Sequence, residues 1–142
     1  MTQHQQLLQK YPKIFKPYEG NPYGVNWEVP DAWIQLIDDL CGAIQSRVDH
    51  WKMWDKDGEH RCPQVTCTQV KEKFGSLRFY YSGGDAQVDG MVNLAAHMSY
   101  NICIDCGSRE DLGRTEGWIT TKCKSCAEKN EDIWNSFENL EE

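Results

Sequence analysis

Apolar side chains recur every three or four positions between residues 30 and 51. This spacing places them on one face of a helix, so the pattern predicts an amphipathic helix over residues 30–51. Pro30 and Asp31 suit its first turn. The N–H that proline lacks would have no partner within the helix at this position, and a carboxylate is favoured by the positive end of the helix dipole. We interpret Cys41 on the apolar face as a small buried hydrophobe, and Asp38 as part of the solvent-exposed face. The apolar face consists of Trp33, Leu36, Ile37, Leu40, Cys41, Ile44, Val48 and Trp51.

Apolar and polar residues alternate over much of residues 64–82, which favours strands over helix. A turn at Phe74-Gly75-Ser76 predicts a β-hairpin over this segment. Gly83 and Gly84 end the second strand. Asp85 is a suitable N-cap for a further helix over residues 86–100, with Val88, Met91, Val92, Ala95 and Met98 facing inward.

The N-terminal part predicts a short helix over Thr2–Lys10, ended by Tyr11-Pro12. Residues 14–30 are rich in proline, glycine, asparagine and aromatic rings, and we expect an ordered but irregular segment that wraps the core. These elements predict an α+β fold in which helices pack on a small antiparallel sheet. We expect an α+β core over residues 1–100, followed by a C-terminal module over residues 101–142.

The C-terminal module contains two Cys-x2-Cys pairs, separated by sixteen residues. Each pair can bind a metal ion from one tight turn, and four thiolates form the tetrahedral sulfur site that zinc prefers. The spacing therefore predicts one structural Zn²⁺. A closed four-sulfur site has no open position for water or substrate, so it indicates a structural rather than a catalytic metal. The predicted ligands are Cys103, Cys106, Cys123 and Cys126.

The segments around these pairs predict the architecture of the module. The first pair and Gly107 form a knuckle, and residues 112–121 form a glycine-interrupted hairpin with Trp118-Ile119 as a strand. The second pair opens a helix-forming stretch over residues 124–140. A knuckle, a hairpin and a helix that carries the second ligand pair make up a treble clef, whereas a zinc ribbon places that pair on another hairpin.

Three other interpretations stay open. A Cys-x-x-Cys pair also occurs in oxidoreductases, although two such pairs favour a metal site. His60, Cys62 and Cys67 could form part of a second metal site with a remote fourth ligand, although their spacing is loose. His97 could approach the knuckle, but a surface histidine on a helix is the simpler interpretation.

The hairpin also carries cations beside aromatic rings, as nucleic-acid stacking surfaces do, although an ordinary half-buried hairpin explains the pattern equally well. These residues are Lys71, Lys73, Arg78, Phe74, Phe79, Tyr80 and Tyr81. No glycine-rich phosphate loop and no catalytic zinc signature is present in the sequence. Treble-clef nucleases use a histidine, and residues 107–122 contain none. Catalysis therefore finds little support.

The charge of the chain is unevenly distributed. The 142 residues carry a formal net charge of −7, with eight acidic against three basic residues in 21–60 and ten against five in 101–142. This balance disfavours duplex DNA and favours either a protein partner or simply a soluble protein. The N-terminus lacks the features of a secretion signal, and the odd number of cysteines, seven, is typical of reduced thiols with a metal site. We expect a cytoplasmic protein without a membrane span; its oligomeric state stays open.

Several segments resemble a family of small uncharacterised bacteriophage and prophage proteins. The central one is Val70–Tyr81 (VKEKFGSLRFYY), followed by Gly-Gly-Asp at residues 83–85. The predicted helical segment Trp33–Cys41 and the cysteine-rich segment 103–123 resemble the family as well, so the resemblance covers most of residues 28–126.

The chain departs from the family at two places. Members commonly open the long helix with a Cys-Gly-Asp-Gly-Trp-like string, where this chain has Glu28–Trp33 and no cysteine. Many members also carry a histidine near the last metal ligand, where this chain has Cys126. The resemblance implies a phage accessory protein and no particular activity.

The leading hypothesis is therefore a phage-encoded, zinc-stabilised protein that binds a host protein in the host cytoplasm, such as a host-defence or host-takeover target. The acidic segments 21–60 and 131–142 would steer it toward a basic face of that partner. A nucleic-acid-binding zinc-finger module is the first alternative. An enzyme such as a nuclease is the second.

Overall fold

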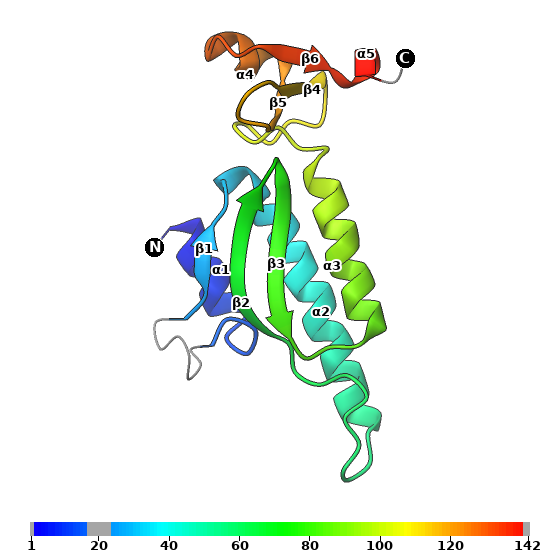
Figure 1. Cartoon of the computed structure of the whole chain (residues 1–142). Coiled ribbons are helices and arrows are strands. Elements are labelled where there is room, and N and C mark those ends of the chain that lie inside the picture. Colours follow the sequence, from blue (N-terminus) through cyan, green and yellow to red (C-terminus); the bar gives the residue numbers. More distant parts are fainter. Residues whose placement is uncertain (1, 17–23, 141–142) are drawn as a thin grey trace.

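The computed structural model describes residues 2–16 and 24–140, and the protein has an α+β architecture (Figure 1). Among the described residues there are two small three-stranded sheets, and α3 leads from the first to the second. In chain order the elements are α1 (Gln3–Lys10), β1 (Asn26–Glu28), a 3₁₀ turn (Asp31–Trp33), α2 (Ile34–Trp54), β2 (Thr66–Lys73), β3 (Ser76–Ser82), α3 (Ala86–Ser99), β4 (Leu112–Thr115), β5 (Thr121–Cys123), α4 (Lys124–Lys129), β6 (Trp134–Ser136) and α5 (Phe137–Leu140).

The first sheet has the strand order β1-β2-β3. The predicted hairpin is present as β2 and β3, which pair antiparallel with Val70 opposite Phe79. β1 adds to β2 in parallel, with Trp27 beside Val70, so the sheet is mixed. The prediction of an irregular segment is wrong for residues 26–28. Residues 17–23 of that segment lie outside the described residues.

The long helix and the helix after the hairpin lie side by side and cover one face of this sheet (Figure 1). Their buried side chains meet those of the strands in one apolar cluster. Cys41 is fully buried in it, as predicted for a small hydrophobe. The largest fully buried members on the 3₁₀ turn, α2, the strands and α3 are Trp33, Ile37, Ile44, Val70, Leu77 and Val88.

The boundaries of these helices differ slightly from the predicted ones. A 3₁₀ turn precedes α2, which continues to Trp54, one turn beyond the predicted end. The side chain of Asp85 accepts a hydrogen bond from the Val88 N–H (3.0 Å), which confirms the predicted N-cap of α3.

Asp38 is not simply a solvated residue. The Tyr11 hydroxyl donates to its Oδ1 at 2.5 Å, and Lys10 Nζ lies 3.0 Å from the same oxygen. The hydrogen bond from Tyr11, helped by Lys10, lowers the pKa of Asp38 below its ordinary value even though partial burial opposes this. The carboxylate therefore connects α1 to α2.

The second sheet lies at the end of the molecule beyond the β2–β3 turn, with the strand order β5-β4-β6 (Figure 1). The predicted helix starts at Lys124 as expected, but it does not continue to residue 140. α4 ends at Lys129, Asn130 caps it by donating to the Cys126 carbonyl (2.8 Å), and Glu131 adopts a left-handed backbone (φ 57°). The chain then turns back so that Trp134 and its neighbours pair with β4.

No helix among the described residues combines the length and the apolar character that crossing a membrane requires.

Candidate metal centre

The first cysteine pair lies in a tight knuckle between α3 and β4. The N–H of Gly107 donates to the Cys103 carbonyl (2.9 Å), and the N–H of Cys103 donates to the Ser108 carbonyl (2.8 Å). Gly107 has a φ of 82°, a backbone conformation that glycine adopts without strain. This local geometry turns both cysteines of the knuckle toward the rest of the module.

The second pair lies where β5 runs into α4. Cys123 is the N-cap of α4, and its sulfur accepts a hydrogen bond from the Cys126 N–H (3.5 Å). Cys126 belongs to the first turn of the helix. A knuckle, a hairpin formed by β4 and β5, and a short helix that carries the second pair form the treble-clef arrangement.

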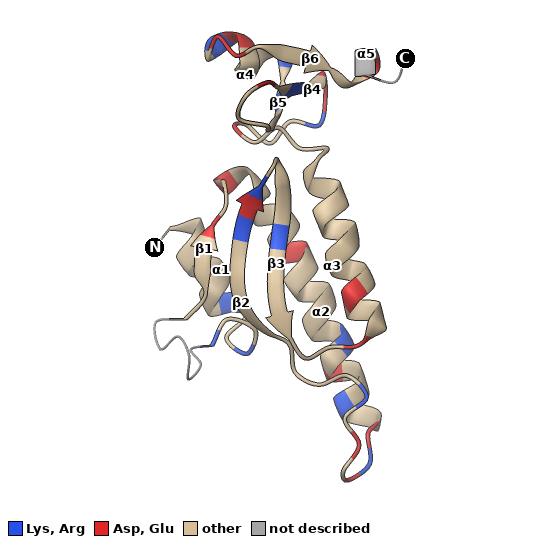
Figure 2. Ribbon diagram, viewed as in Figure 1, with Lys and Arg blue, Asp and Glu red and all other residues tan. Residues whose placement is uncertain are grey.

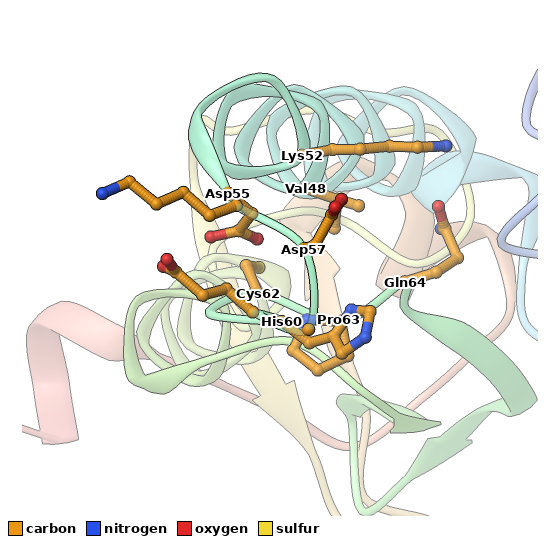
Figure 3. Close-up of a pocket in the computed structure, with 11 residues that line it drawn as sticks. Val48, Lys52, Asp55, Asp57, His60, Cys62, Pro63 and Gln64 are labelled. Carbon is orange, nitrogen blue, oxygen red and sulfur yellow. The ribbon is translucent and has the colours of Figure 1, made fainter.

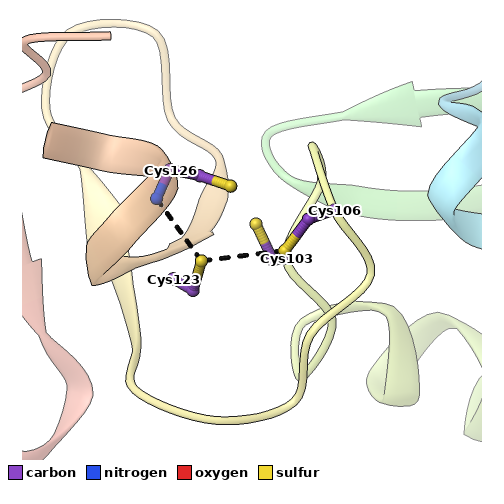
Figure 4. Close-up of side chains that lie close together, drawn as sticks. All are labelled: Cys103, Cys106, Cys123 and Cys126. Carbon is purple, nitrogen blue, oxygen red and sulfur yellow. Dashed lines mark hydrogen bonds between the residues drawn. The ribbon is translucent and has the colours of Figure 1, made fainter. Parts of the chain in front are cut away.

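The four sulfur atoms converge on one point (Figure 4). All four Sγ atoms lie within 4.8 Å of one another, and those of Cys106 and Cys123 are 3.7 Å apart. Cys103, Cys123 and Cys126 are buried and Cys106 is exposed, while all seven cysteines of the chain are free of disulfides. The predicted ligands are therefore close enough for one metal ion to bind them together.

The electrostatics of this cluster differ from sulfur to sulfur. Burial acts to raise the pKa of Cys103, but backbone N–H groups of the knuckle and of Cys123 outweigh it and lower the pKa to about 7. Burial raises the pKa of Cys126, and the three neighbouring sulfurs raise it further. A cation at the centre favours the thiolate form of all four, because it offsets the repulsion between their charges.

Ion pairs and a hydrogen bond around the sulfurs connect the knuckle, β5 and β6. Lys122 Nζ lies 3.1 Å from Asp105 in the knuckle and 2.8 Å from Asp132 before β6. The indole N–H of Trp134 donates to the Lys122 carbonyl (2.9 Å). Lys122 therefore bridges two carboxylates from different segments of the module. Leu112 packs against the cysteines as their apolar neighbour.

The second candidate metal site is not assembled. His60 and Cys62 line a pocket of about 380 Å³ beside the end of α2 (Figure 3), but Cys67 is buried in the apolar core. Within residues 2–16 and 24–140, the four-cysteine cluster is the one group of three or more potential metal ligands that converges. Burial and the nearby carboxylate of Asp85 raise the pKa of Cys62, which disfavours a thiolate there. His97 is exposed on α3.

The predicted stacking surface on the hairpin is smaller than the sequence indicates. Phe79 is buried, and Tyr81 packs against the core and donates to Asp89. Phe74 and Tyr80 remain exposed.

The predicted strand at Trp118-Ile119 is wrong, and the sequence pattern therefore did not indicate that the Trp118 ring is exposed. Trp118 lies instead in the connection between β4 and β5 and is 81% exposed. The glycine that precedes it was the available signal for a loop.

No protein-family model, curated protein or solved structure matches the chain.

Proposed function

We propose that the metal of the C-terminal module is one structural Zn²⁺. Zinc binds cysteine sulfur at about 2.3 Å, so a tetrahedral site separates its sulfurs by about 3.8 Å. The 3.7 Å between Cys106 and Cys123 matches that separation. Cys103, Cys106, Cys123 and Cys126 would fill all four positions, so the ion supplies a fixed crosslink and has no position for a substrate.

The proposed function is a phage-encoded accessory protein that acts by binding a host protein. The observation that supports it most is the exposure of large apolar side chains on the C-terminal module: Trp118 is 81% and Ile133 is 67% exposed. Exposed apolar groups of this size, gathered on a small module, are typical of an interaction surface. The resemblance of Val70–Tyr81 to phage proteins supports the viral origin.

The charge distribution supports a protein partner over nucleic acid. Acidic residues outnumber basic ones by ten to five over residues 101–142, whereas the loop that follows α2, at the opposite end of the molecule, carries charges of both signs (Figure 2). The net negative charge of the chain disfavours a polyanion that has no extended basic surface to contact. The hairpin retains only Phe74 and Tyr80 as exposed rings beside its cations, which weakens the nucleic-acid alternative.

The test is affinity capture of the tagged, zinc-loaded protein from host cells, with mass spectrometry of what it retains. We expect one host protein at near-equimolar amount, and metal analysis to give one zinc per chain. An eluate identical to that of the tag alone in several candidate hosts contradicts the proposal. Binding of single-stranded DNA that weakens steeply with salt, in place of a captured protein, supports the nucleic-acid alternative.

A further inference from the structure

A pocket of about 240 Å³ lies where the tip of the β2–β3 hairpin meets the C-terminal module. The hairpin contributes Lys71, Glu72, Lys73 and Phe74, and the β4–β5 connection contributes Gly117, Trp118 and Ile119. We call these seven residues the notch. Pockets for drug-sized ligands are commonly about 300–1,000 Å³, so the notch suits a single large side chain.

The apolar side chains of the notch are unusually exposed. Phe74 is 63%, Trp118 81% and Ile119 39% exposed. Tryptophan and other large rings dominate the binding energy of protein interfaces when a partner covers them. The notch therefore has the composition of an interaction site rather than of ordinary surface.

The wall that carries Trp118 is held rigidly from within. The buried Thr115 hydroxyl donates to the Trp118 carbonyl (2.7 Å) and accepts from the Thr120 N–H (3.0 Å). On the other side of the loop, the Glu116 N–H donates to the Ile133 carbonyl (2.9 Å). A ring presented on a fixed loop loses little conformational entropy when it binds.

The two walls touch through close backbone packing. A Cβ placed on Gly75 at the hairpin tip would lie 3.3 Å from the Thr120 Cα, so the tip and the loop are in direct contact. Thr121, next in the chain, donates from its hydroxyl to the Tyr100 carbonyl (3.1 Å). Cys123 ends the same strand, so the metal centre and the Trp118 wall belong to one short segment of chain.

The charges of the notch favour an acidic ligand. The Glu72 carboxylate accepts a hydrogen bond from the Gly75 N–H (3.0 Å) and is thereby engaged within the hairpin. Lys71 and Lys73 have no ion-pair partner among the described residues, and Lys73 lies over the Phe74 ring. The free cations flank apolar walls, so a ligand with an apolar side chain next to carboxylates complements both features.

We infer that the notch is the docking site for an acidic peptide segment of the partner protein, with one large apolar side chain inserted between Phe74 and Trp118 and carboxylates bound by Lys71 and Lys73. This inference rests on the proposed function and specifies its surface. Two lysines suffice for a short acidic segment, whereas a nucleic-acid strand needs a longer basic track. Because the metal organises the Trp118 wall, docking also requires the metal-loaded form.

The test begins with a library of random heptapeptides displayed for selection against the full-length, zinc-loaded protein. We expect the selected peptides to share a large apolar residue next to Asp or Glu. Their affinity, measured by fluorescence polarisation, should fall about tenfold or more in Trp118→Ala and in Phe74→Ala. Lys73→Glu should weaken binding and shift the preference away from acidic residues.

Matched controls separate the notch from general effects. Trp54→Ala removes another exposed tryptophan, 63% exposed at the end of α2, and Lys56→Glu reverses a charge far from the notch; both should leave the affinity unchanged. Circular dichroism and zinc content should match the parent in every variant. The inference is overturned if no peptides are selected, or if their affinity is the same for Trp118→Ala as for the parent. It is also overturned if a fluorescent dT15 oligonucleotide binds at the notch and peptides do not.

The inference and the proposed function fail differently. If a host protein is captured equally well by the parent and by Trp118→Ala, the proposed function stands and the notch is not the docking site. If no host protein is captured by the parent, the proposed function itself falls.

Discussion

At the residue scale, the tip of the hairpin combines an unfavourable backbone with an exposed ring. Phe74 and Gly75 are the two central residues of the β2–β3 turn, and both have positive φ (54° and 83°). Such turns favour Asn-Gly because a bulky side chain is strained in the left-handed region. The ring of Phe74 gains little burial in return, which fits a residue retained for binding rather than for folding.

Phe74→Asn should therefore stabilise the protein while weakening peptide binding. Relief of left-handed strain should raise the free energy of unfolding by up to about 1 kcal/mol, measured by urea denaturation. Gly75→Ala should act in the opposite direction, because alanine is strained at φ 83° and crowds Thr120. A Phe74→Asn variant that is less stable than the parent contradicts this account of the turn.

The contact of Asp38 with Tyr11 and Lys10 predicts a pH dependence. Because the folded protein lowers the pKa of this carboxyl, the stabilisation is present above the unfolded pKa of about 4 and is lost as pH falls through the folded pKa. Asp38→Asn should lower the thermal midpoint at about pH 6, and this difference should shrink toward pH 3. Asp49→Asn, which removes a carboxylate bonded to Gln45 on the same helix, is the control and should have little effect. A constant difference across this range contradicts the role of the charge.

At the element scale, the sequence predicts those elements whose signal is local. The apolar periodicity of α2 and the capping aspartate of α3 are such signals, and so is the spacing of the four cysteines. The predicted C-terminal helix fails because pairing of Trp134–Ser136 with β4 overrides the helix propensity of that stretch. β1 and the notch depend on contacts between residues far apart in sequence, which no local pattern encodes.

The central position of β4 makes Gly113 a sensitive site. A Cβ there would lie 2.4 Å from the Asn135 carbonyl oxygen and from the Trp134 ring, so Gly113→Ala should force β6 away and cost about 1–3 kcal/mol of stability. Gly90→Ala is the matched control in α3, where a Cβ meets nothing within 4 Å; it should stabilise the protein by about 1 kcal/mol. Chemical denaturation of both variants checks the contrast. If Gly113→Ala and Gly90→Ala change the free energy of unfolding equally, close packing of β6 against Gly113 does not determine the stability at this site.

At the scale of the whole molecule, the two apolar clusters are separate. The large one extends from Leu7 to Ile102, whereas the small one consists of Cys103, Cys123 and Cys126 with Leu112 packed against it. The small cluster is too limited to hold the module by burial alone, so the proposed Zn²⁺ would supply most of its folding free energy, about 10–16 kcal/mol in zinc-finger peptides. The large cluster contains no metal ligand and should fold without the ion.

Removal of the metal should therefore unfold one part of the chain only. In the reduced protein treated with a strong chelator, we expect amide exchange protection to be lost across residues 103–136 and retained in α2 and in the β2–β3 hairpin. The indole N–H resonance of Trp118, identified by its absence in Trp118→Phe, should move to its chemical shift in the unfolded chain, and added Zn²⁺ should restore the original shift. Serine at Cys103 and Cys106 together should reproduce the chelated state, whereas Cys41→Ala lies in the large cluster and should leave zinc binding intact. Simultaneous loss of protection in both parts would mean that the ion supports the whole fold, and retained protection in both would mean that packing alone holds the module.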